Sequence, residues 1–292
     1  MTDWQGIAEQ ISAASGRPFD PGRPQVIGGG CINRAVVLGS EDWRLFVKIN
    51  RADRLSMFEA EAAGLGEMAA TNSIRVPEPV CTGVVGGESF IAMEHVDLHG
   101  GRGNAIAAGR RLAAMHRATR ELFGWERDNT IGSTPQTNRV SADWVGFWRE
   151  HRLGFQLELA ARNGYRGRLQ RDGGRLLDGL GALLDHDPVA SLLHGDLWGG
   201  NLGYDQGGEP VIFDPACYFG DREADLAMTE LFGGFGDRFR AAYEEAWPLN
   251  PGYAVRKQLY NLYHVINHLN LFGGGYLSQA ESMIDRLLSE IS

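Results

Sequence analysis

The chain has 292 residues, of which 43% are hydrophobic and 22% are charged. These are ordinary values for a globular protein, so they exclude a disordered, collagenous or coiled-coil chain. The formal net charge is −9, which argues against a general nucleic-acid-binding protein because such proteins usually carry a basic face. A phosphate-handling enzyme stays open, since one lysine and a bound metal can act locally.

The three cysteines, Cys31, Cys81 and Cys217, are too few and too widely spaced to indicate a disulfide framework or a zinc site. The first ten residues, MTDWQGIAEQ, lack the basic and apolar regions of a signal peptide. No apolar run is long enough to cross a membrane. We therefore expect a cytoplasmic protein that binds neither nucleic acid nor membrane.

The first third of the chain predicts a small antiparallel sheet with helices. Trp4, Ile7 and Ile11 share one face of a short helix. Alternating patterns and glycine turns then indicate short strands. The expected strands are 25–30, 34–40, 43–49, 79–85 and 89–96, with a helix at 56–70 between the third and the fourth.

Helical periodicity dominates after residue 96. The expected helices are 104–119, 141–163, 174–185, 223–232, 235–246, 253–272 and 277–290, interrupted by a loop-and-strand stretch from Ser191 to Asp214. The glycine-rich segment 100–103 is a candidate junction. We predict an α+β fold of two lobes, in which residues 1–95 form a sheet-rich N-lobe and residues 96–292 a mostly helical C-lobe.

The strongest chemical signal is the segment HGDLWGGN at 194–201, followed by Asp214 at the end of an apolar strand pattern. Phosphoryl transfer needs a carboxylate that orients the acceptor hydroxyl and oxygen ligands that hold Mg²⁺ on the ATP phosphates. Asp196, Asn201 and Asp214 follow the kinase order H-x-D-x-x-x-x-N and then Asp. An ordinary turn with a loop cap would account for Asp196 and Asn201, but it would not account for Asp214. For His194 we expect a structural role, holding the loop.

Lys48 lies on a strand pattern, and Glu61 follows it thirteen residues later in the next helix. A lysine that reaches the α- and β-phosphates is held in place by a helix carboxylate. Glu59 is the alternative partner, because Glu59 and Glu61 lie about 200° apart around a helix and only one can face Lys48. We favour Glu61, since Leu65 and Met68 then lie on the same inward face. A strand lysine alone is more often a solvated edge residue.

Two weaker signals extend a nucleotide site. Gly28, Gly29 and Gly30 lie between two strands, where backbone amides could approach phosphate, although the segment matches no complete phosphate-binding motif. At the end of an apolar strand pattern, the Glu94 carbonyl and the Val96 amide could pair with adenine. Each signal is weak by itself and is supported by its position in the chain relative to Lys48 and to the segment 194–201.

The chain resembles the fructosamine kinase (ketosamine kinase) family, which belongs to the protein-kinase-like clan with aminoglycoside and choline kinases. The resemblance runs from about residue 25 to residue 280 through the segments GGGCINR, FVKIN, MFEAEAAGL, RVPEPV, FIAMEHVDL, HGDLWGGN, FDPACYFGDREADLAM and YHVINHLNLFGGGY. It implies a bilobal protein-kinase-like fold and ATP-dependent phosphorylation of the sugar 3-hydroxyl of a ketosamine. Such adducts form when amines are glycated, and phosphorylation makes them unstable, so the family is linked with protein deglycation.

The resemblance also implies a role for individual residues. These are Asp196 as the catalytic base, Asn201 and Asp214 as Mg²⁺ ligands, Lys48 with Glu61 as the phosphate-positioning pair, Asp225 as the aspartate that holds the catalytic-loop backbone, and Trp198 and His268 as substrate-pocket residues. Cys31, within the glycine loop, is a redox candidate because backbone amides could lower the pKa of its thiol. Its simpler interpretation is a small residue that fills a turn.

Three other functions compete with this one. A protein Ser/Thr kinase would carry lysine at the position of Trp198 and a later A-P-E segment, and this chain has neither. An aminoglycoside- or choline-like phosphotransferase fits the NHLNLFGGGY segment poorly. A non-catalytic nucleotide-binding module would be expected to lack Lys48, Asp196 or Asp214. The sugar (fructosamine, ribulosamine or erythrulosamine) stays open, as does the choice between small-molecule ketosamines and glycated proteins.

Overall fold

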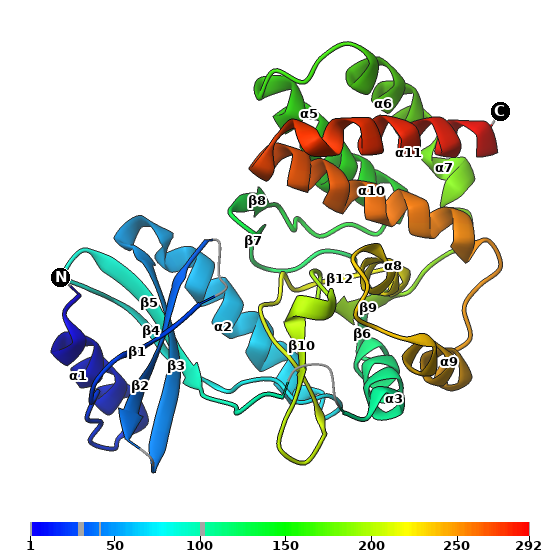
Figure 1. Ribbon diagram of the computed structural model, residues 1–292. Coiled ribbons are helices and arrows are strands. Elements are labelled where there is room, and N and C mark those ends of the chain that lie inside the picture. The colour runs from blue at the N-terminus through cyan, green and yellow to red at the C-terminus, as the bar shows by residue number, and fades with distance from the viewer. Residues whose placement is uncertain (1, 29–31, 41, 100–102, 292) are drawn as a thin grey trace. The chain divides into compact units, whose positions relative to one another are not determined.

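The computed structural model describes residues 2–28, 32–40, 42–99 and 103–291 (Figure 1). The chain forms two compact units, one of residues 1–104 with 202–215 and the other of residues 105–201 with 216–292. The first unit therefore takes in a segment from the middle of the chain, which a single cut in the sequence does not represent. The lobe boundary at residue 95/96 stays a prediction.

A five-stranded antiparallel sheet forms the centre of the first unit, in the order β1-β2-β3-β5-β4. Together with the many helices it confirms the predicted α+β class. The strands are β1 (Gln25–Ile27), β2 (Arg34–Ser40), β3 (Trp43–Arg51), β4 (Pro79–Val85) and β5 (Glu88–Glu94), and the helices are α1 (Trp4–Ser15), a 3-10 turn at Ala52–Arg54 and α2 (Leu55–Ala70). In Figure 1, α1 and α2 lie on either side of this sheet.

The alternation of β3 decides which way its lysine points. Leu45, Val47 and Ile49 are buried in the hydrophobic core that includes Ile7 and Ile11 of α1. Because successive side chains of a strand point to opposite faces, the lysine between Val47 and Ile49 points to the other face, which α2 covers. The pattern of β3 thus brings one cation to the α2 side of the sheet.

A hairpin of β10 (Leu202–Tyr204) and β11 (Pro210–Ile212) belongs to the first unit. Arg75 attaches it, since the Ile212 amide donates to the Arg75 carbonyl at 3.0 Å. The Arg75 guanidinium also binds Asp205 at 2.7 Å and Glu94 at 2.6 Å. Asp214 follows β11 by two residues, so this attachment fixes its place in the first unit.

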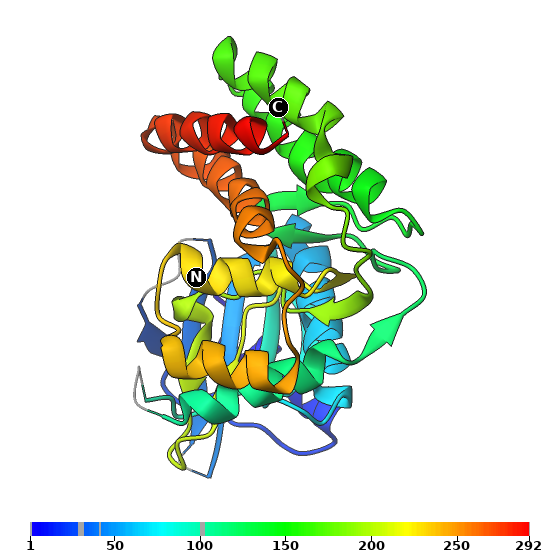
Figure 2. The same cartoon turned by 90° about the vertical axis from the view of Figure 1, so that its right-hand side faces the viewer.

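The second unit is mostly helical, with α10 and α11 side by side at one end (Figures 1 and 2). Its helices are α3 (Ala105–His116), α4 (Trp144–Trp148), α5 (Gly154–Arg162), α6 (Arg168–Asp178), α7 (Leu180–Leu183), α8 (Glu223–Leu231), α9 (Asp237–Ala246), α10 (Tyr253–Phe272) and α11 (Leu277–Glu290), with 3-10 turns at Gly199–Asn201 and Gly274–Tyr276. Its strands are β6 (Thr119–Arg120), β7 (Asn129–Ile131), β8 (Thr134–Gln136), β9 (Ala190–Leu193) and β12 (Tyr218–Gly220). Among the described residues, no helix combines the length and the apolarity needed to cross a membrane.

The helix expected at 141–163 begins later and is interrupted, which corrects that prediction. A π-helical turn at Arg149–Leu153 separates α4 from α5. The extra residue in this turn carries Arg152 into the interior, where its guanidinium donates to the Thr137 carbonyl at 2.8 Å and to Asn138 Oδ1 at 2.6 Å. It also lies 4.0 Å from the ring centre of Tyr218. A regular helical repeat cannot reveal such a local insertion.

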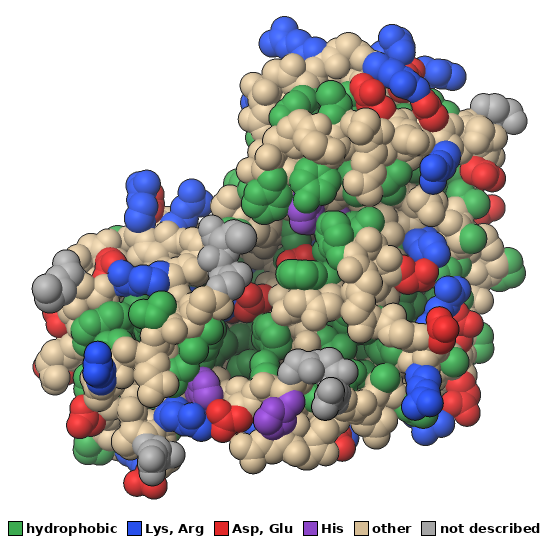
Figure 3. All heavy atoms as spheres, viewed as in Figure 1, with side chains coloured by type: hydrophobic (Ala, Val, Ile, Leu, Met, Phe, Trp, Pro, Cys, Tyr) green, Lys and Arg blue, Asp and Glu red, His purple; other side chains and the backbone are tan. Residues whose placement is uncertain are grey.

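The helix expected at 174–185 is also corrected. It begins earlier, at Arg168, and α6 and α7 share the segment with a break at Gly179. Within α6, the largely buried carboxylate of Asp172 forms an ion pair with Arg171 at 2.9 Å. Figure 3 shows basic side chains beside acidic ones at the top of the second unit. A polar, solvated helix of this kind shows little apolar repeat at its start, so its N-terminus is hard to predict.

Candidate active site

Lys48 and Glu61 form a buried ion pair in the first unit. Lys48 Nζ lies 2.5 Å from Glu61 Oε1, and the side chain of each is less than a tenth exposed. Glu59 is exposed, whereas Leu65 and Met68 are buried beneath Glu61. The helix face that we favoured from the sequence is therefore the one that meets the lysine.

A second carboxylate, Asp214, also contacts Lys48 Nζ. Burial by itself lowers the pKa of the Lys48 ammonium, but the charges of Glu61 and Asp214 outweigh it and raise the pKa above its ordinary value. The lysine is thus charged at neutral pH. Two carboxylates hold the Lys48 ammonium on one face of the sheet, and this arrangement suits a lysine that binds phosphate oxygens.

Asp214 has an unusual backbone for a non-glycine residue. Its φ is 59°, in the left-handed region, which is uncommon outside glycine and turns. Its side chain is 48% exposed while one oxygen contacts Lys48. The left-handed turn after β11 thus lets the carboxylate contact a buried cation and still reach solvent.

The loop of residues 194–201 lies in the second unit and positions Asp196 beside Asn201. Asn201 Nδ2 donates to the Asp196 carbonyl at 2.9 Å and to Asp196 Oδ2 at 3.3 Å. Because these bonds use the amide nitrogen, Asn201 Oδ1 is directed away from them. Carboxylate and amide oxygens are the ligands that Mg²⁺ prefers. Asn201 in the second unit and Asp214 in the first each carry an oxygen of this type.

Asp225 of α8 holds the start of this loop. Its carboxylate accepts hydrogen bonds from the His194 amide at 2.7 Å and the Gly195 amide at 2.8 Å. Burial raises the pKa of Asp225, but hydrogen bonds and charge from His116 and the contribution of His194 and Gly195 lower it below its ordinary value. The aspartate is ionised and acts as a fixed acceptor for the loop backbone.

Gly195 lets the loop pass very close to the segment after Asp214. Its φ is +81°, and a Cβ there would lie 2.1 Å from the Ala216 carbonyl oxygen. The Ala216 amide donates to the His194 carbonyl at 2.8 Å. His194 itself is fully buried, and its Nδ1 accepts from the Asp196 amide at 3.2 Å. These contacts support the structural role expected for His194.

An aromatic cluster surrounds the two residues expected in the substrate pocket. We define it as Trp198, Phe232, His268, Phe272 and Tyr276. The ring of Phe232 lies 6.3 Å from Trp198 and 5.0 Å from His268, and His268 lies 5.4 Å from Phe272 and 5.3 Å from Tyr276. Trp198 is 40% exposed, so the cluster presents an aromatic surface. Figure 3 shows hydrophobic side chains gathered around a histidine below the left-hand end of α10.

The tautomer of His268 follows from its helix. Its Nδ1 lies 2.8 Å from the His264 carbonyl oxygen, which can only accept, so Nδ1 carries the proton. Burial lowers the pKa of His268 below its ordinary value. At neutral pH, Nε2 therefore keeps a lone pair that can accept a hydrogen bond from a hydroxyl.

The residues expected at the nucleotide base lie at a strand end. Glu94 closes β5, and its side chain binds Arg75. Within the described part of the chain, the Val96 amide has no hydrogen-bond partner. In the expected phosphate loop, Gly28 is described and exposed. Gly29, Gly30 and Cys31 lie outside the described residues.

Three members of the aromatic cluster were missed from the sequence. Phe272 could have been found, because it follows His268 by four residues on one helix and so lies on the same face. Tyr276 lies beyond the helix end, and Phe232 lies in the glycine-rich segment after α8, where no periodicity predicts where a ring points.

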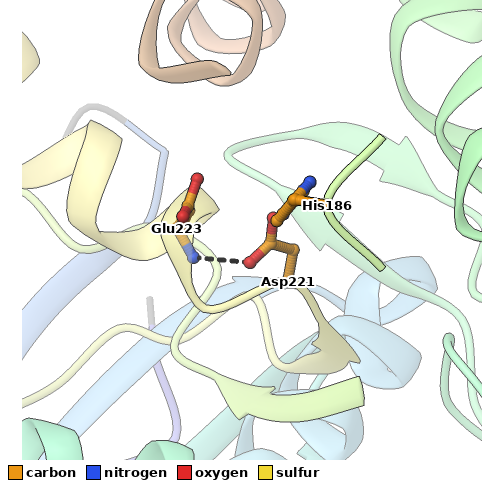
Figure 4. Close-up of side chains that lie close together, drawn as sticks. All are labelled: His186, Asp221 and Glu223. Carbon is orange, nitrogen blue, oxygen red and sulfur yellow. Dashed lines mark hydrogen bonds and ion pairs between the residues drawn. The ribbon is translucent and has the colours of Figure 1, made fainter. Parts of the chain in front are cut away.

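A separate polar group consists of His186, Asp221 and Glu223 (Figure 4). His186 Nε2 lies 2.6 Å from Asp221, and the Glu223 amide donates to Asp221 at 3.0 Å. Arg256 binds both oxygens of Glu223, at 2.6 and 2.9 Å. Tyr260 donates to Asp221 at 2.5 Å. Because protein donors already satisfy both carboxylates, this group braces the start of α8.

Comparisons with known proteins agree over nearly the whole chain. A family model described as fructosamine kinase matches residues 3–290. The chloroplastic protein-ribulosamine 3-kinase of Arabidopsis thaliana is 48% identical over 266 residues, covering 90% of this chain and 81% of that protein. Ketosamine-3-kinase of Mus musculus is 34% identical over 288 residues, covering 89% of this chain and 93% of that protein.

Solved structures give the same result. A crystal structure from Haemophilus somnus, provisionally named fructosamine-3-kinase, matches with a TM-score of 0.89 at 29% identity, covering 98% of this chain and 97% of that one. An aminoglycoside phosphotransferase matches with a TM-score of 0.63 at 14% identity, covering 97% and 98%. At that low identity the likeness shows the protein-kinase-like fold alone.

Proposed function

Because the chain belongs to the fructosamine kinase family, we propose that it transfers the γ-phosphoryl group of ATP to the 3-hydroxyl of a ketosamine. The family assignment confirms the resemblance seen in the sequence, and the structural neighbours confirm the expected protein-kinase-like α+β fold. Members of this family are kinases that use ATP and phosphorylate a hydroxyl group. The names of the plant and mouse relatives support a ketosamine as the acceptor.

The observation that carries the proposal is the pair of carboxylates on Lys48 Nζ. A strand lysine, a helix glutamate and a post-strand aspartate meet at one atom, and these are the groups that phosphoryl transfer uses. We assign Lys48, held by Glu61, to the ATP phosphates. The glycine loop at Gly28 would lie over them, and the backbone of Glu94 and Val96 would receive the adenine.

The metal ligands and the catalytic base would come from the two segments that flank the β10–β11 hairpin. Asn201 and Asp214 would each supply an oxygen ligand to Mg²⁺. When bound, this ion neutralises charge on the phosphates. Asp196, beside Asn201, would orient the 3-hydroxyl and accept its proton. The hydrogen bonds from Asn201 Nδ2 to Asp196 support this division of roles.

Trp198 and His268 would receive the ketosugar. An aromatic face suits the C–H surface of a sugar or the cation of a secondary amine, and His268 Nε2 can accept from a sugar hydroxyl. Both small-molecule ketosamines and glycated proteins fit this proposal, which extends to protein deglycation. A cytoplasmic location and the absence of nucleic-acid and membrane partners stay predictions.

An ADP-release assay tests the proposal. Ketosamines of fructose, ribulose and erythrulose would be compared with aminoglycosides and choline, using the wild type, Asp196→Asn and the exposed control Asp178→Asn. Removing a positioned base costs about 10²–10⁴ in rate, so Asp196→Asn should bind ATP and lose turnover while Asp178→Asn behaves as wild type. Near-full kcat in Asp196→Asn would refute its role, and turnover of aminoglycosides or choline alone would refute the substrate class.

A further inference from the structure

A cavity of about 430 Å³ lies in the second unit where the end of α8 meets α10 and α11. Leu231 closes one side of it, and the remaining walls are mainly polar. The polar lining consists of Glu230 from α8, Lys257, Gln258 and Asn261 from α10, and Gln279, Ser282 and Arg286 from α11. The phosphoryl transfer proposed above uses none of these side chains.

Asn261 is the unusual member of this lining. It is only 6% exposed, and its Oδ1 is buried without a hydrogen-bond partner among the described residues. A buried amide oxygen without a donor is costly, whereas pairing it recovers that free energy. Because Asn261 forms part of the cavity wall, a ligand N–H group could supply the missing donor if the amide rotates toward the cavity.

The charges of the cavity also limit its ligand. Lys257 Nζ is neutralised by Glu230 at 2.7 Å, while Arg286 is an exposed cation. The cavity therefore does not favour a cationic ligand. Its glutamine, serine and asparagine groups offer both donors and acceptors, which suits an uncharged amide.

The cavity and the aromatic cluster share one face of α10. Lys257, Asn261, His264 and His268 are spaced by four, three and four residues, which places them in one row along the helix. Asn261 and His268 are seven residues apart, or about 10 Å along the axis.

The end of α8 makes the same connection. Leu231 lines the cavity, and the next residue, Phe232, has its ring 6.3 Å from Trp198 and 5.0 Å from His268. The aromatic cluster and the cavity therefore adjoin at the C-terminal end of α8.

We infer that this cavity binds the main chain of the polypeptide whose lysine carries the ketosugar, with Asn261 paired to a main-chain amide. The inference rests on the proposed function and names its substrate class more closely. A lysine side chain has a four-carbon stem and spans about 6 Å, and the sugar carbons add a few ångströms, so the span from the sugar to the main chain matches the spacing of His268 and Asn261. Main-chain recognition would let the enzyme accept glycated lysines in many sequences.

Two ketosamines that share one sugar test this inference. One is built on Nα-acetyl-lysine methylamide, which carries two main-chain amides, and the other on n-hexylamine, which carries none. Since one or two hydrogen bonds separate them, we expect the wild-type KM for the lysine derivative to be about tenfold lower. In Asn261→Ala the ratio of the two KM values should approach one.

Ser282→Trp gives a second variant that does not depend on a buried position. Ser282 is exposed at the cavity, so the indole should fill the cavity without disturbing the core and should also abolish the ratio. Ser289→Trp is the matched control, because Ser289 is exposed on the same helix and does not line the cavity. It should keep the wild-type ratio.

The outcomes separate this inference from the proposed function. Equal KM values for the two ketosamines in the wild type, or a wild-type ratio in both Asn261→Ala and Ser282→Trp, would overturn the cavity assignment and leave the kinase activity standing. Turnover of neither ketosamine would overturn the proposed function. In that case, calorimetric titration of the lysine derivative still tests the cavity, since only the wild type and Ser289→Trp should bind it.

Discussion

The exposure of Trp198 separates two interpretations of this residue. A core tryptophan would be almost fully buried, and its truncation would cost about 3–5 kcal/mol of stability. Trp198 is instead 40% exposed and packs edge-on against Phe232. We therefore expect Trp198→Ala to raise the KM for the ketosamine about tenfold, with the KM for ATP and the melting temperature little changed.

Steady-state kinetics and thermal unfolding measure this directly. Leu122→Ala is a suitable control, because Leu122 has a similar exposed fraction of 42% in the same unit and no place in the aromatic cluster. A Trp198→Ala enzyme that keeps the wild-type ketosamine KM, or that merely unfolds, would remove Trp198 from the acceptor site.

Glu61 and Glu59 form a natural matched pair on α2. Glu61→Gln keeps the shape of the side chain but removes the charge that holds Lys48 at 2.5 Å. Because Asp214 remains on the lysine, Lys48 should stay charged but lose its fixed position. We expect kcat to fall on the order of 10²-fold, while Glu59→Gln, at an exposed position, should match the wild type. Equal kinetics for the two variants would refute the assignment of Glu61.

At the scale of elements, α8 stabilises the loop of residues 194–201 through Asp225. In Asp225→Asn the buried carboxylate that accepts from two loop amides becomes neutral, and its amide nitrogen faces donors. We expect a loss of about 3 kcal/mol in the free energy of unfolding, together with reduced kcat, measured by urea unfolding and steady-state assays. Wild-type stability in Asp225→Asn would contradict a role in holding the loop.

The pH dependence of this contact follows from its sign. The pKa of Asp225 is lowered in the folded protein, so its stabilising contribution is complete above the unfolded value of about 3.9. It is lost as the pH falls through the lower folded value. Asp225→Asn should therefore differ most from the wild type near neutral pH and converge with it in strong acid.

The elements that could be predicted are those with a clear period. β3 alternates over nine residues and α2 keeps one apolar face over sixteen, so the sequence placed Lys48 opposite Glu61 correctly. β6, β7, β8 and β12 have two or three residues each, which is too short for any period to appear. The π-helical turn at Arg149–Leu153 escaped prediction for the opposite reason, because it breaks a pattern that otherwise looks continuous.

For the whole molecule, the order of the sequence does not reveal that residues 202–215 belong to the first unit. The β10–β11 hairpin joins the first unit through the parallel bridge of Arg75 and Val211, a contact between residues 136 positions apart in the sequence. The spacing of the motifs still placed Lys48 beside Glu61 and Asp196 beside Asn201, because the members of these pairs are only thirteen and five residues apart in the sequence. The aromatic cluster was found only in part, since its rings come from three separate segments.

Buried neutral histidines make the stability of the whole molecule sensitive to mild acid. Burial, His268 and Arg152 lower the pKa of His264 to about 3, and its Nδ1 has no partner among the described residues. The pKa values of His95, His151 and His268 are lowered as well, chiefly by burial. In the unfolded chain these groups titrate near pH 6.5.

The sign of the effect is therefore fixed. Below about pH 6.5, His264 is protonated in the unfolded chain, whereas in the folded protein it stays neutral until about pH 3. The free energy of unfolding therefore falls as the pH falls between these two values. The slope is about 1.4 kcal/mol per pH unit for each such group. His264→Gln cannot titrate, and it should reduce the slope of unfolding free energy against pH by that amount between pH 6 and pH 4, as urea unfolding at several pH values would measure. The exposed His99→Gln should keep the wild-type slope. If His264→Gln and the wild type lose stability in parallel, the folded protein protonates His264 without penalty, and the acid sensitivity must arise from other groups.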